Sequence, residues 1–226
     1  MATRSVFEEF DNQDAILDVP GNEVLILRPQ DSKSTIGTQR FNGHACLVLM
    51  GTSPGSAVIM ARFDCISAGR SSSEIIPGSE EEKSFLAEVE VDYMKMLRKV
   101  VKLFLDEHDL LRLPLAWLVL HHHDYPALSA LLREKTVKIF QHLRIQTGVS
   151  ICNESTIRAV SQQPPKFKVF AVRSEAGVPE IHVGDDLVYP KVHSGSLAPA
   201  FDKLGTGQVD NESEDYVAPH NYSYRR

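Results

Sequence analysis

Apolar residues along the chain follow two different spacings, and each spacing predicts one kind of secondary structure. Over residues 83–109 they recur at steps of three and four among Glu, Lys and Arg, which places them on one face of a helix. Ser79 and Glu82 come just before this run with the spacing of a capping box. A second helix is predicted from Pro126, with Gly148 as its stop, because proline is favoured in a first helical turn and glycine after a last one.

Shorter apolar runs without a helical period predict strands. "NEVLILRP" predicts a strand that ends at Pro29, and "LPLAWLVLHHH" and "VSICNE" predict two more. "HACLVLM" and "SAVIMARFD" predict a hairpin, because "GTSPG" between them has the glycine and proline of a tight connection. A second hairpin is predicted in "KFKVFAVRSEAGVPEIHVGDD", where apolar and polar residues alternate on both sides of "SEAG".

Two segments lack this regularity. "QDSKSTIGTQRFNG" predicts a loop from its composition, and "SVFEEFDNQDAIL" predicts either a short amphipathic helix or a frayed segment. The predicted order is therefore strand, hairpin, long helix, strand, helix, strand, hairpin. Mixed strands with two helices on one side indicate an α+β fold, a layered domain built on a mixed β-sheet. Apolar density falls after Pro190, so we expect residues 1–190 to form one domain and residues 191–226 a flexible tail.

Composition narrows the classes of function. The chain has 226 residues, 42% of them hydrophobic, which suits one globular domain. Its formal net charge is −6 and its Lys and Arg residues form no basic stripe, so nucleic acid is not expected as a partner. No apolar run approaches the roughly 20 residues of a membrane-spanning helix, and phosphate-binding glycine motifs are absent, so neither a membrane nor a nucleotide cofactor is expected. Three scattered cysteines and a polar amino-terminal stretch indicate a cytoplasmic protein with reduced thiols.

The most informative motif is "FNGHAC", which places Cys46 at the mouth of an apolar run and His44 two residues before it. With the order of the elements, it resembles the chemoreceptor glutamine deamidase family, CheD, whose fold is shared with the catalytic domain of the cytotoxic necrotizing factor toxins. The resemblance covers roughly residues 23–184. In that family a "GSC" turn presents a catalytic cysteine at the start of a hairpin, and the second hairpin strand carries a catalytic histidine.

The resemblance implies roles for particular residues of this chain. "GHAC" occupies the place of the family's turn, so Cys46 corresponds to the nucleophile. "MARF" falls where the histidine motif stands, so Arg62 takes the histidine position. Thr38 is nearest to the family's loop threonine, although slightly too far from Cys46 along the chain. The implied activity is deamidation of a protein or small-molecule amide.

Deamidation by a cysteine requires a thiolate that attacks the amide carbonyl and a proton for the departing ammonia. Arg62 cannot supply that proton, because the pKa of a guanidinium stays above about 12; it could lower the pKa of the thiol or hold an oxyanion. His44 is a candidate acid, since residues two apart on a strand point to the same face. The triplet His121–His123 is another. Consecutive histidines on a strand cannot all reach one ion, so no metal is expected.

Each candidate also has a structural interpretation. Cys46 before "LVLM" is by default a small buried residue, and Arg62 can simply face solvent and pair with Asp64. Two functions stay open. In the first, the chain is a cysteine-dependent amidohydrolase with Cys46, His44 and Arg62 as site residues, and the Cys46 thiol is accessible and reactive. In the second, it is a catalytically inactive CheD-like scaffold that binds a protein partner.

Overall fold

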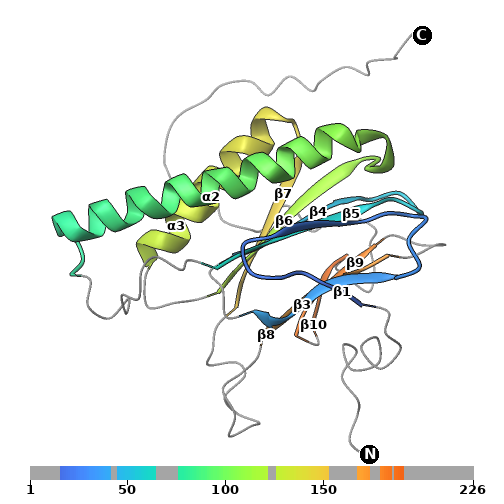
Figure 1. The fold of residues 1–226 in the computed structure, drawn as a ribbon, viewed down its shortest axis with the longest axis horizontal. Coiled ribbons are helices and arrows are strands. Elements are labelled where there is room, and N and C mark those ends of the chain that lie inside the picture. The colour runs from blue at the N-terminus through green and yellow to red at the C-terminus, as the bar shows by residue number, and fades with distance from the viewer. Residues whose placement is uncertain are drawn as a thin grey trace, which may run out of the picture. The chain divides into compact units, whose positions relative to one another are not determined.

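The computed structural model describes residues 16–41, 45–64, 76–121, 126–152, 167–173, 179–184 and 186–190. Within these ranges two helices cover one face of a five-stranded sheet, and a second five-stranded sheet packs on its other face (Figure 1). We call the sheet between these layers the central sheet and the second one the outer sheet. The predicted α+β fold, with a layered mixed sheet and two helices on one side, is confirmed.

The central sheet has the strand order β2-β5-β4-β6-β7. β4 pairs antiparallel with β5, which confirms the predicted hairpin, and with β6, whereas β6 and β7 are parallel. All seven residues of β4 are buried, because a strand covered on both faces needs apolar side chains at every position. The strands are β2 (Val24–Leu27), β5 (Val58–Phe63), β4 (Ala45–Gly51), β6 (Pro114–His121) and β7 (Gln146–Cys152).

The outer sheet has the strand order β1-β3-β8-β9-β10. β8 and β9 are antiparallel, as the second predicted hairpin requires. The prediction of a loop over "QDSKSTIGTQRFNG" is wrong, because β3 lies within this segment and pairs with both β1 and β8. Thr35 and Thr38 of β3 are fully buried, so polar residues here belong to the interior. The strands are β1 (Ile16–Asp18), β3 (Thr35–Phe41), β8 (Phe167–Val172), β9 (Glu180–Val183) and β10 (Asp186–Tyr189).

α2 (Glu80–Asp106) begins where the capping motif predicts. The Ser79 Oγ accepts a hydrogen bond from the Glu82 backbone N–H at 3.1 Å, and the Glu82 carboxylate accepts one from the backbone just before Ser79. The glutamates of the first turn also stabilise the helix through its dipole. The predicted end at Asp109 is slightly late, because a 3₁₀ turn, η2 (His108–Leu110), follows the helix.

α3 (Pro126–His142) begins at the predicted proline but ends before the predicted stop. Arg144 has a left-handed backbone conformation, with φ of 57°, and it turns the chain out of the helix and toward β7. Gly148 lies inside β7, so its predicted role as the helix stop is wrong. A β-carbon on Gly148 would lie 2.4 Å from Trp117 Cε3. The glycine is therefore required by close packing of neighbouring strands.

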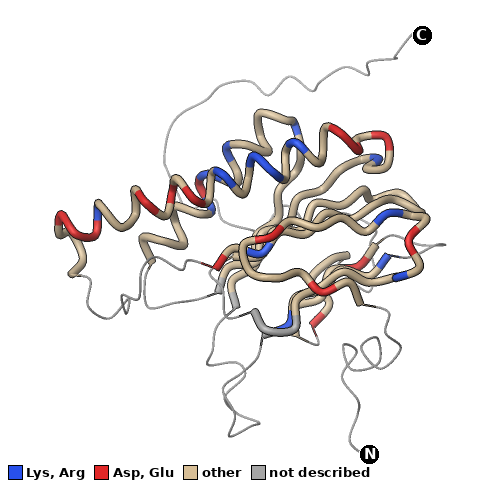
Figure 2. The backbone as a smooth tube through the Cα atoms, in the orientation of Figure 1, with Lys and Arg blue, Asp and Glu red and all other residues tan. Residues whose placement is uncertain are grey.

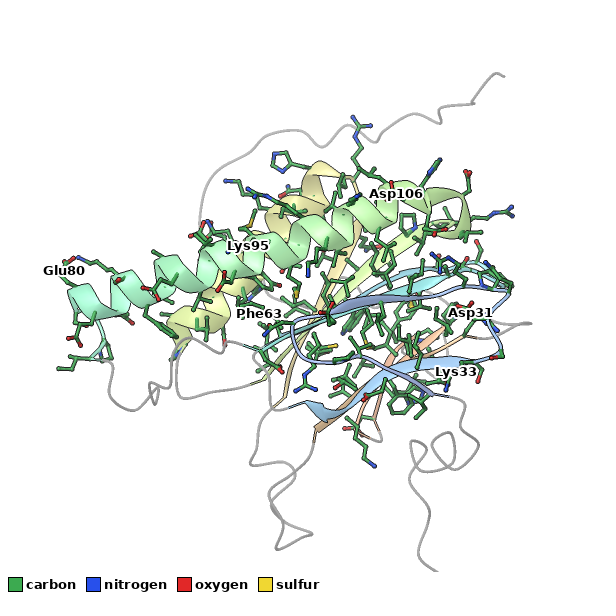
Figure 3. All side chains as sticks on the ribbon, in the orientation of Figure 1. Asp31, Lys33, Phe63, Glu80, Lys95 and Asp106 are labelled. Atoms are coloured by element: carbon green, nitrogen blue, oxygen red, sulfur yellow. The ribbon has the colours of Figure 1, made fainter. Side chains whose placement is uncertain are left out.

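Two apolar layers hold the domain together, one on each face of the central sheet. Along β4 the side chains alternate, so that Leu47 faces the helices and Val48 faces the outer sheet. On the helix side Tyr93 packs edge-on against Phe63, which Figure 3 labels below α2. Tyr93 is completely buried, which raises the pKa of its phenol, and its hydroxyl lies 2.5 Å from Thr136 Oγ1 on α3.

Charged residues are unevenly distributed over these layers. β4 and β6 contain no Lys, Arg, Asp or Glu, whereas Figure 2 shows such residues along both helices and near strand ends. By its contacts the chain divides into Met1–Pro190 and Lys191–Arg226. The predicted flexibility of the second unit stays a prediction, since it lies outside the described residues. The segment "SVFEEFDNQDAIL" also lies outside the described residues, except for Ile16 and Leu17. These two residues belong to β1.

Candidate functional site

The register of the central hairpin places Cys46 and Arg62 side by side. Cys46 on β4 lies opposite Arg62 on β5. The Arg62 backbone N–H donates to the carbonyl of Glu23, next to β2, at 3.1 Å, so Cys46 and Arg62 are a non-hydrogen-bonded pair. In such a pair the Cα atoms are about 4.5 Å apart and both side chains lie on the same face. That face is the layer between the two sheets, where Cys46 packs.

Arg62 is held by contacts from two elements. Its Nε donates to Asp64 Oδ1 at 2.9 Å, and its Nη2 lies 2.8 Å from Asp64 Oδ2, a two-point pairing of guanidinium and carboxylate. Its Nη1 donates to Thr38 Oγ1 on β3 at 3.1 Å. The predicted pairing with Asp64 is confirmed. The expectation that Arg62 faces solvent is wrong, because only 15% of its side chain is exposed.

The turn before β2 positions the Asp64 carboxylate. The Asp64 backbone N–H donates to Asn22 Oδ1 at 3.0 Å, and Asn22 has the left-handed φ of 60°. A β-carbon on Gly21 would lie 2.3 Å from Asp64 Oδ2, so a larger residue there would displace the carboxylate. Sequence reasoning missed both residues. "PGN" indicates a turn, but a turn motif does not tell which distant side chain it contacts.

The three positions that the family resemblance singles out meet at one end of the layer between the sheets. Cys46 and Arg62 lie on neighbouring strands, and Thr38 reaches Arg62 from the facing sheet. The separation of Thr38 from Cys46 along the chain therefore does not matter, because β3 belongs to the opposite sheet. A guanidinium at this place can hold an anion or stabilise negative charge, but it cannot donate a proton to a leaving group.

Cys46 has no exposed surface. It lies in an apolar layer that also contains Val48, Met60 and Val119. The amidohydrolase hypothesis requires an accessible thiol, and this expectation is wrong in the present conformation. The structural interpretation of Cys46, a small buried residue at the start of an apolar strand, agrees with its burial.

The histidines predicted to protonate the ammonia that leaves at Cys46 are His44 and the triplet His121–His123. His44 and the side chains of His121–His123 are not among the described parts of the chain. His182 is described, but its ring stacks on Phe170 at 4.7 Å between ring centroids, in a cluster separate from the Cys46 layer. The role of His44 as an acid stays a prediction.

A groove of about 540 Å³ runs along β2, at the edge of the central sheet. Its lining includes neither Arg62 nor Cys46, Asp64 or Thr38. It is formed by side chains of β1, β2 and α2 and by the loop after β2, where Figure 3 labels Asp31 and Lys33. The lining comprises Leu17, Val24, Leu25, Ile26, Leu27, Arg28, Asp31, Ser32, Lys33 and Leu103.

No protein-family model matches the chain, and no curated protein is significantly similar to it. Its class is therefore defined by the α+β fold and the residues described above. Within the described ranges, no helix combines the length and apolar character needed to cross a bilayer. The same ranges contain no group of three metal-ligating side chains close enough to hold an ion.

Proposed function

We propose that this chain is a catalytically inactive, CheD-like scaffold that binds a protein partner. The observation that supports this proposal most is that Arg62 is a guanidinium already bound by other side chains. It takes the histidine position of the resemblance, and its guanidinium is engaged by Asp64 and Thr38. A guanidinium stays protonated in proteins, so the step in which ammonia takes up a proton has no donor at this position.

The burial of Cys46 supports the same proposal. A nucleophile must touch the carbonyl carbon that it attacks, and Cys46 has none of its surface exposed. Its two strand neighbours in the central sheet, Arg62 and Val119, flank it on both sides. Attack on a protein-bound amide would therefore require the end of the central hairpin to open.

Support for a protein partner comes from the described surface. Besides the groove along β2, a second groove of about 420 Å³ is lined by residues of α2 and by Ile139 of α3. Its apolar lining comes from Val101, Leu105 and Ile139. Charges of both signs border it, from Arg98, Lys102 and Asp106. Leu105 is 56% exposed. Apolar grooves with charged neighbours are typical of surfaces that bind protein segments.

The test is an assay for Cys46 chemistry. The full chain and its Cys46→Ala variant are incubated with glutamine-containing peptides and with small amides, while intact mass and ammonia release are followed. The proposal predicts no covalent adduct and equal, background ammonia release from both proteins. Iodoacetamide should alkylate Cys46 in urea but not in the native protein. A CheD-family deamidase serves as the positive control for the assay.

A second candidate function has one specific observation in its favour. Cys46, Arg62 and Thr38 come together as the resemblance to a cysteine deamidase implies. In that function the Cys46 thiolate attacks an amide, Arg62 stabilises the oxyanion, an imidazole protonates the departing ammonia, and water hydrolyses the thioester. Ammonia release that is lost in Cys46→Ala would establish this function and overturn the first one.

A further inference from the structure

We propose that the groove between α2 and α3 binds an acidic amphipathic helix of a partner protein. This inference rests on the proposed function, because it names the chemistry of the partner that the scaffold would bind. Three features of the two helices support it: a second apolar face on α2, the shape of the groove and the charges that border it.

α2 has a second apolar face besides the one that it buries. The buried face comprises Val89, Tyr93, Met96, Leu97 and Val100. The second face, which we call the α2 seam, is interrupted by one arginine and comprises Val91, Met94, Arg98, Val101 and Leu105. Its steps alternate between three and four residues, a spacing typical of a helix that packs along another helix. Val91 and Leu105, at its two ends, are each 56% exposed, so the seam is open to a partner.

α3 makes a groove of the last part of the seam. The two helices lie side by side, since Lys135 Nζ of α3 lies 2.6 Å from Glu90 Oε1 of α2. The groove of about 420 Å³ is lined on α2 by residues between Arg98 and Asp106 and on α3 by Ile139. At a rise of about 1.5 Å per residue, this part of α2 is roughly 12 Å long, or about two helical turns. The groove can therefore hold two turns of an added helix.

A helix fits this groove better than an extended segment does. Both walls are helices, whose backbone N–H and C=O groups are hydrogen-bonded within each helix. An extended segment on the apolar lining would leave part of its own backbone groups without partners, whereas a helix pairs them internally. The occupant is therefore expected to be helical, with its apolar side chains on Val101, Leu105 and Ile139.

The charges beside the groove are mainly positive. Figure 2 shows Lys and Arg in the middle of α2 between acidic residues at its two ends, and α2 has no carboxylate between Lys95 and Asp106, which Figure 3 labels. Arg98 and Lys102 line the groove, and Lys138 of α3 comes just before the residue that forms the other wall. Within the described ranges none of these three side chains forms an ion pair. The whole chain has a net charge of −6, so this positive region is a local feature that favours an acidic partner.

Asp106 gives the groove a polarity and distinguishes a protein from other anionic partners. It lines the same groove as Arg98, at the end of α2. A phosphate backbone or a layer of anionic lipid headgroups would be repelled there and would leave Val101 and Leu105 uncovered. We expect a partner helix with Asp or Glu opposite Arg98 and Lys102, and with Lys or Arg opposite Asp106. A second copy of the groove has the same excess of positive charge and is a poorer complement.

Titration of the full chain into a fluorescently labelled peptide, followed by anisotropy, tests the proposal. The probe is a synthetic heptad-repeat peptide with leucine at a and d and glutamate at e and g, and saturable binding is expected. Lys102→Glu should raise the dissociation constant at least about fivefold at low salt, and Arg98→Glu with Lys102→Glu at least about twentyfold. Leu105→Ala should raise it about two- to tenfold without loss of folding, because Leu105 is exposed. Asp106→Lys should lower it about two- to fivefold, because it removes a negative charge beside the glutamates.

The matched control is Lys83→Glu, the same change of charge in the first turn of α2 and outside the seam. It should leave the dissociation constant unchanged. A second peptide with lysine in place of glutamate should bind the Arg98→Glu, Lys102→Glu variant better than the unmodified chain, a reversal that misfolding cannot produce. Absence of binding up to on the order of 1 mM, or equal effects of Lys83→Glu and Lys102→Glu, would overturn the proposal.

Other occupants of the groove give different results. Vesicles of phosphatidylserine and phosphatidylcholine and a DNA duplex are titrated in the same way, and tighter binding of either than of the acidic peptide would contradict a protein partner. So would a dimer in sedimentation that Lys102→Glu dissociates, since a second copy would then occupy the groove. The Cys46 assay reports separately. Peptide binding together with ammonia release that depends on Cys46 overturns the proposed function and leaves the helix site, whereas an inert Cys46 without peptide binding overturns only the helix site.

Discussion

β4 and β2 belong to the same sheet and have similar apolar sequences, "ACLVLMG" and "VLIL", yet their surroundings differ. β4 has a strand on each side and an apolar layer on each face, and all its residues are buried. β2 has a strand on one side, and three of its four residues are partly buried. Apolar sequence alone therefore does not distinguish the sealed middle of a sheet from its open edge.

The difference matters for function because the candidate nucleophile, Cys46, lies on β4. Cys46 is closed off by the strands beside it and the layer above it. The surface that a partner can reach lies on β2, whose residues have no reactive side chain. If burial separates the two strands in this way, substitutions at tightly packed positions should cost more than substitutions at open positions.

The largest expected difference is between two leucine truncations. Leu47→Ala on β4 should lower the free energy of unfolding by about 2–5 kcal/mol, because Leu47 is 1% exposed and a cavity would remain. Leu25→Ala on β2 should cost roughly 1 kcal/mol, since its partly buried site loses less apolar contact. Urea unfolding at low protein concentration measures both. Equal losses would contradict the contrast between the two strands.

A second comparison uses β7, the other edge of the central sheet. Gly148→Ala should destabilise the protein by about 1–3 kcal/mol, because the new β-carbon would overlap the Trp117 ring. Trp117 is the chain's one tryptophan, so its emission should shift in the same variant. Gln146→Ala, at an exposed position of β7, is the control and should change neither quantity. An unchanged tryptophan emission in Gly148→Ala would show that β6 and β7 are not in close contact at Trp117 and Gly148.

The ion pair at Arg62 should contribute more than a surface pair. Asp64→Asn should cost about 1–3 kcal/mol, because Arg62 would lose a charged partner at a site where 15% and 19% of the two side chains are exposed. Asp92→Asn removes the partner of Lys95 at a highly exposed pair and should cost less than about 0.5 kcal/mol. Thermal or urea unfolding distinguishes them. A cost for Asp64→Asn as small as that of the control would mean that Arg62 is not held by this pair.

The smallest expected effect concerns two tyrosines. Burial raises the pKa of Tyr93 in the core, and it also raises that of the half-buried Tyr189 on β10. A raised pKa in the folded state means that the unfolded chain ionises first, so stability falls as pH rises through about 10. Tyr93→Phe should cost about 1 kcal/mol at neutral pH through loss of the Thr136 hydrogen bond. Its unfolding free energy should then decline less steeply between pH 9 and 11 than that of the unmodified chain, and equal slopes would contradict this.

Local pattern was sufficient wherever one element determines its own structure. The three- and four-residue spacing predicted α2, and the Ser79–Glu82 pair located its start. The "GTSPG" connection predicted the β4–β5 hairpin. From the strand and helix order the layered α+β fold follows, because amphipathic helices and apolar strands bury their surfaces in few arrangements.

Tertiary structure decided what depends on contacts between distant segments. β3 is a strand because β1 and β8 pair with it, although four of its seven residues are polar. Thr38 reaches Arg62 because their sheets face each other, and Gly21 positions Asp64 through a close approach that no sequence spacing encodes. Burial of Cys46 depends on both neighbouring strands and the facing sheet. A residue's type sets which chemistry it can perform, but the packing around it determines whether a substrate can reach it.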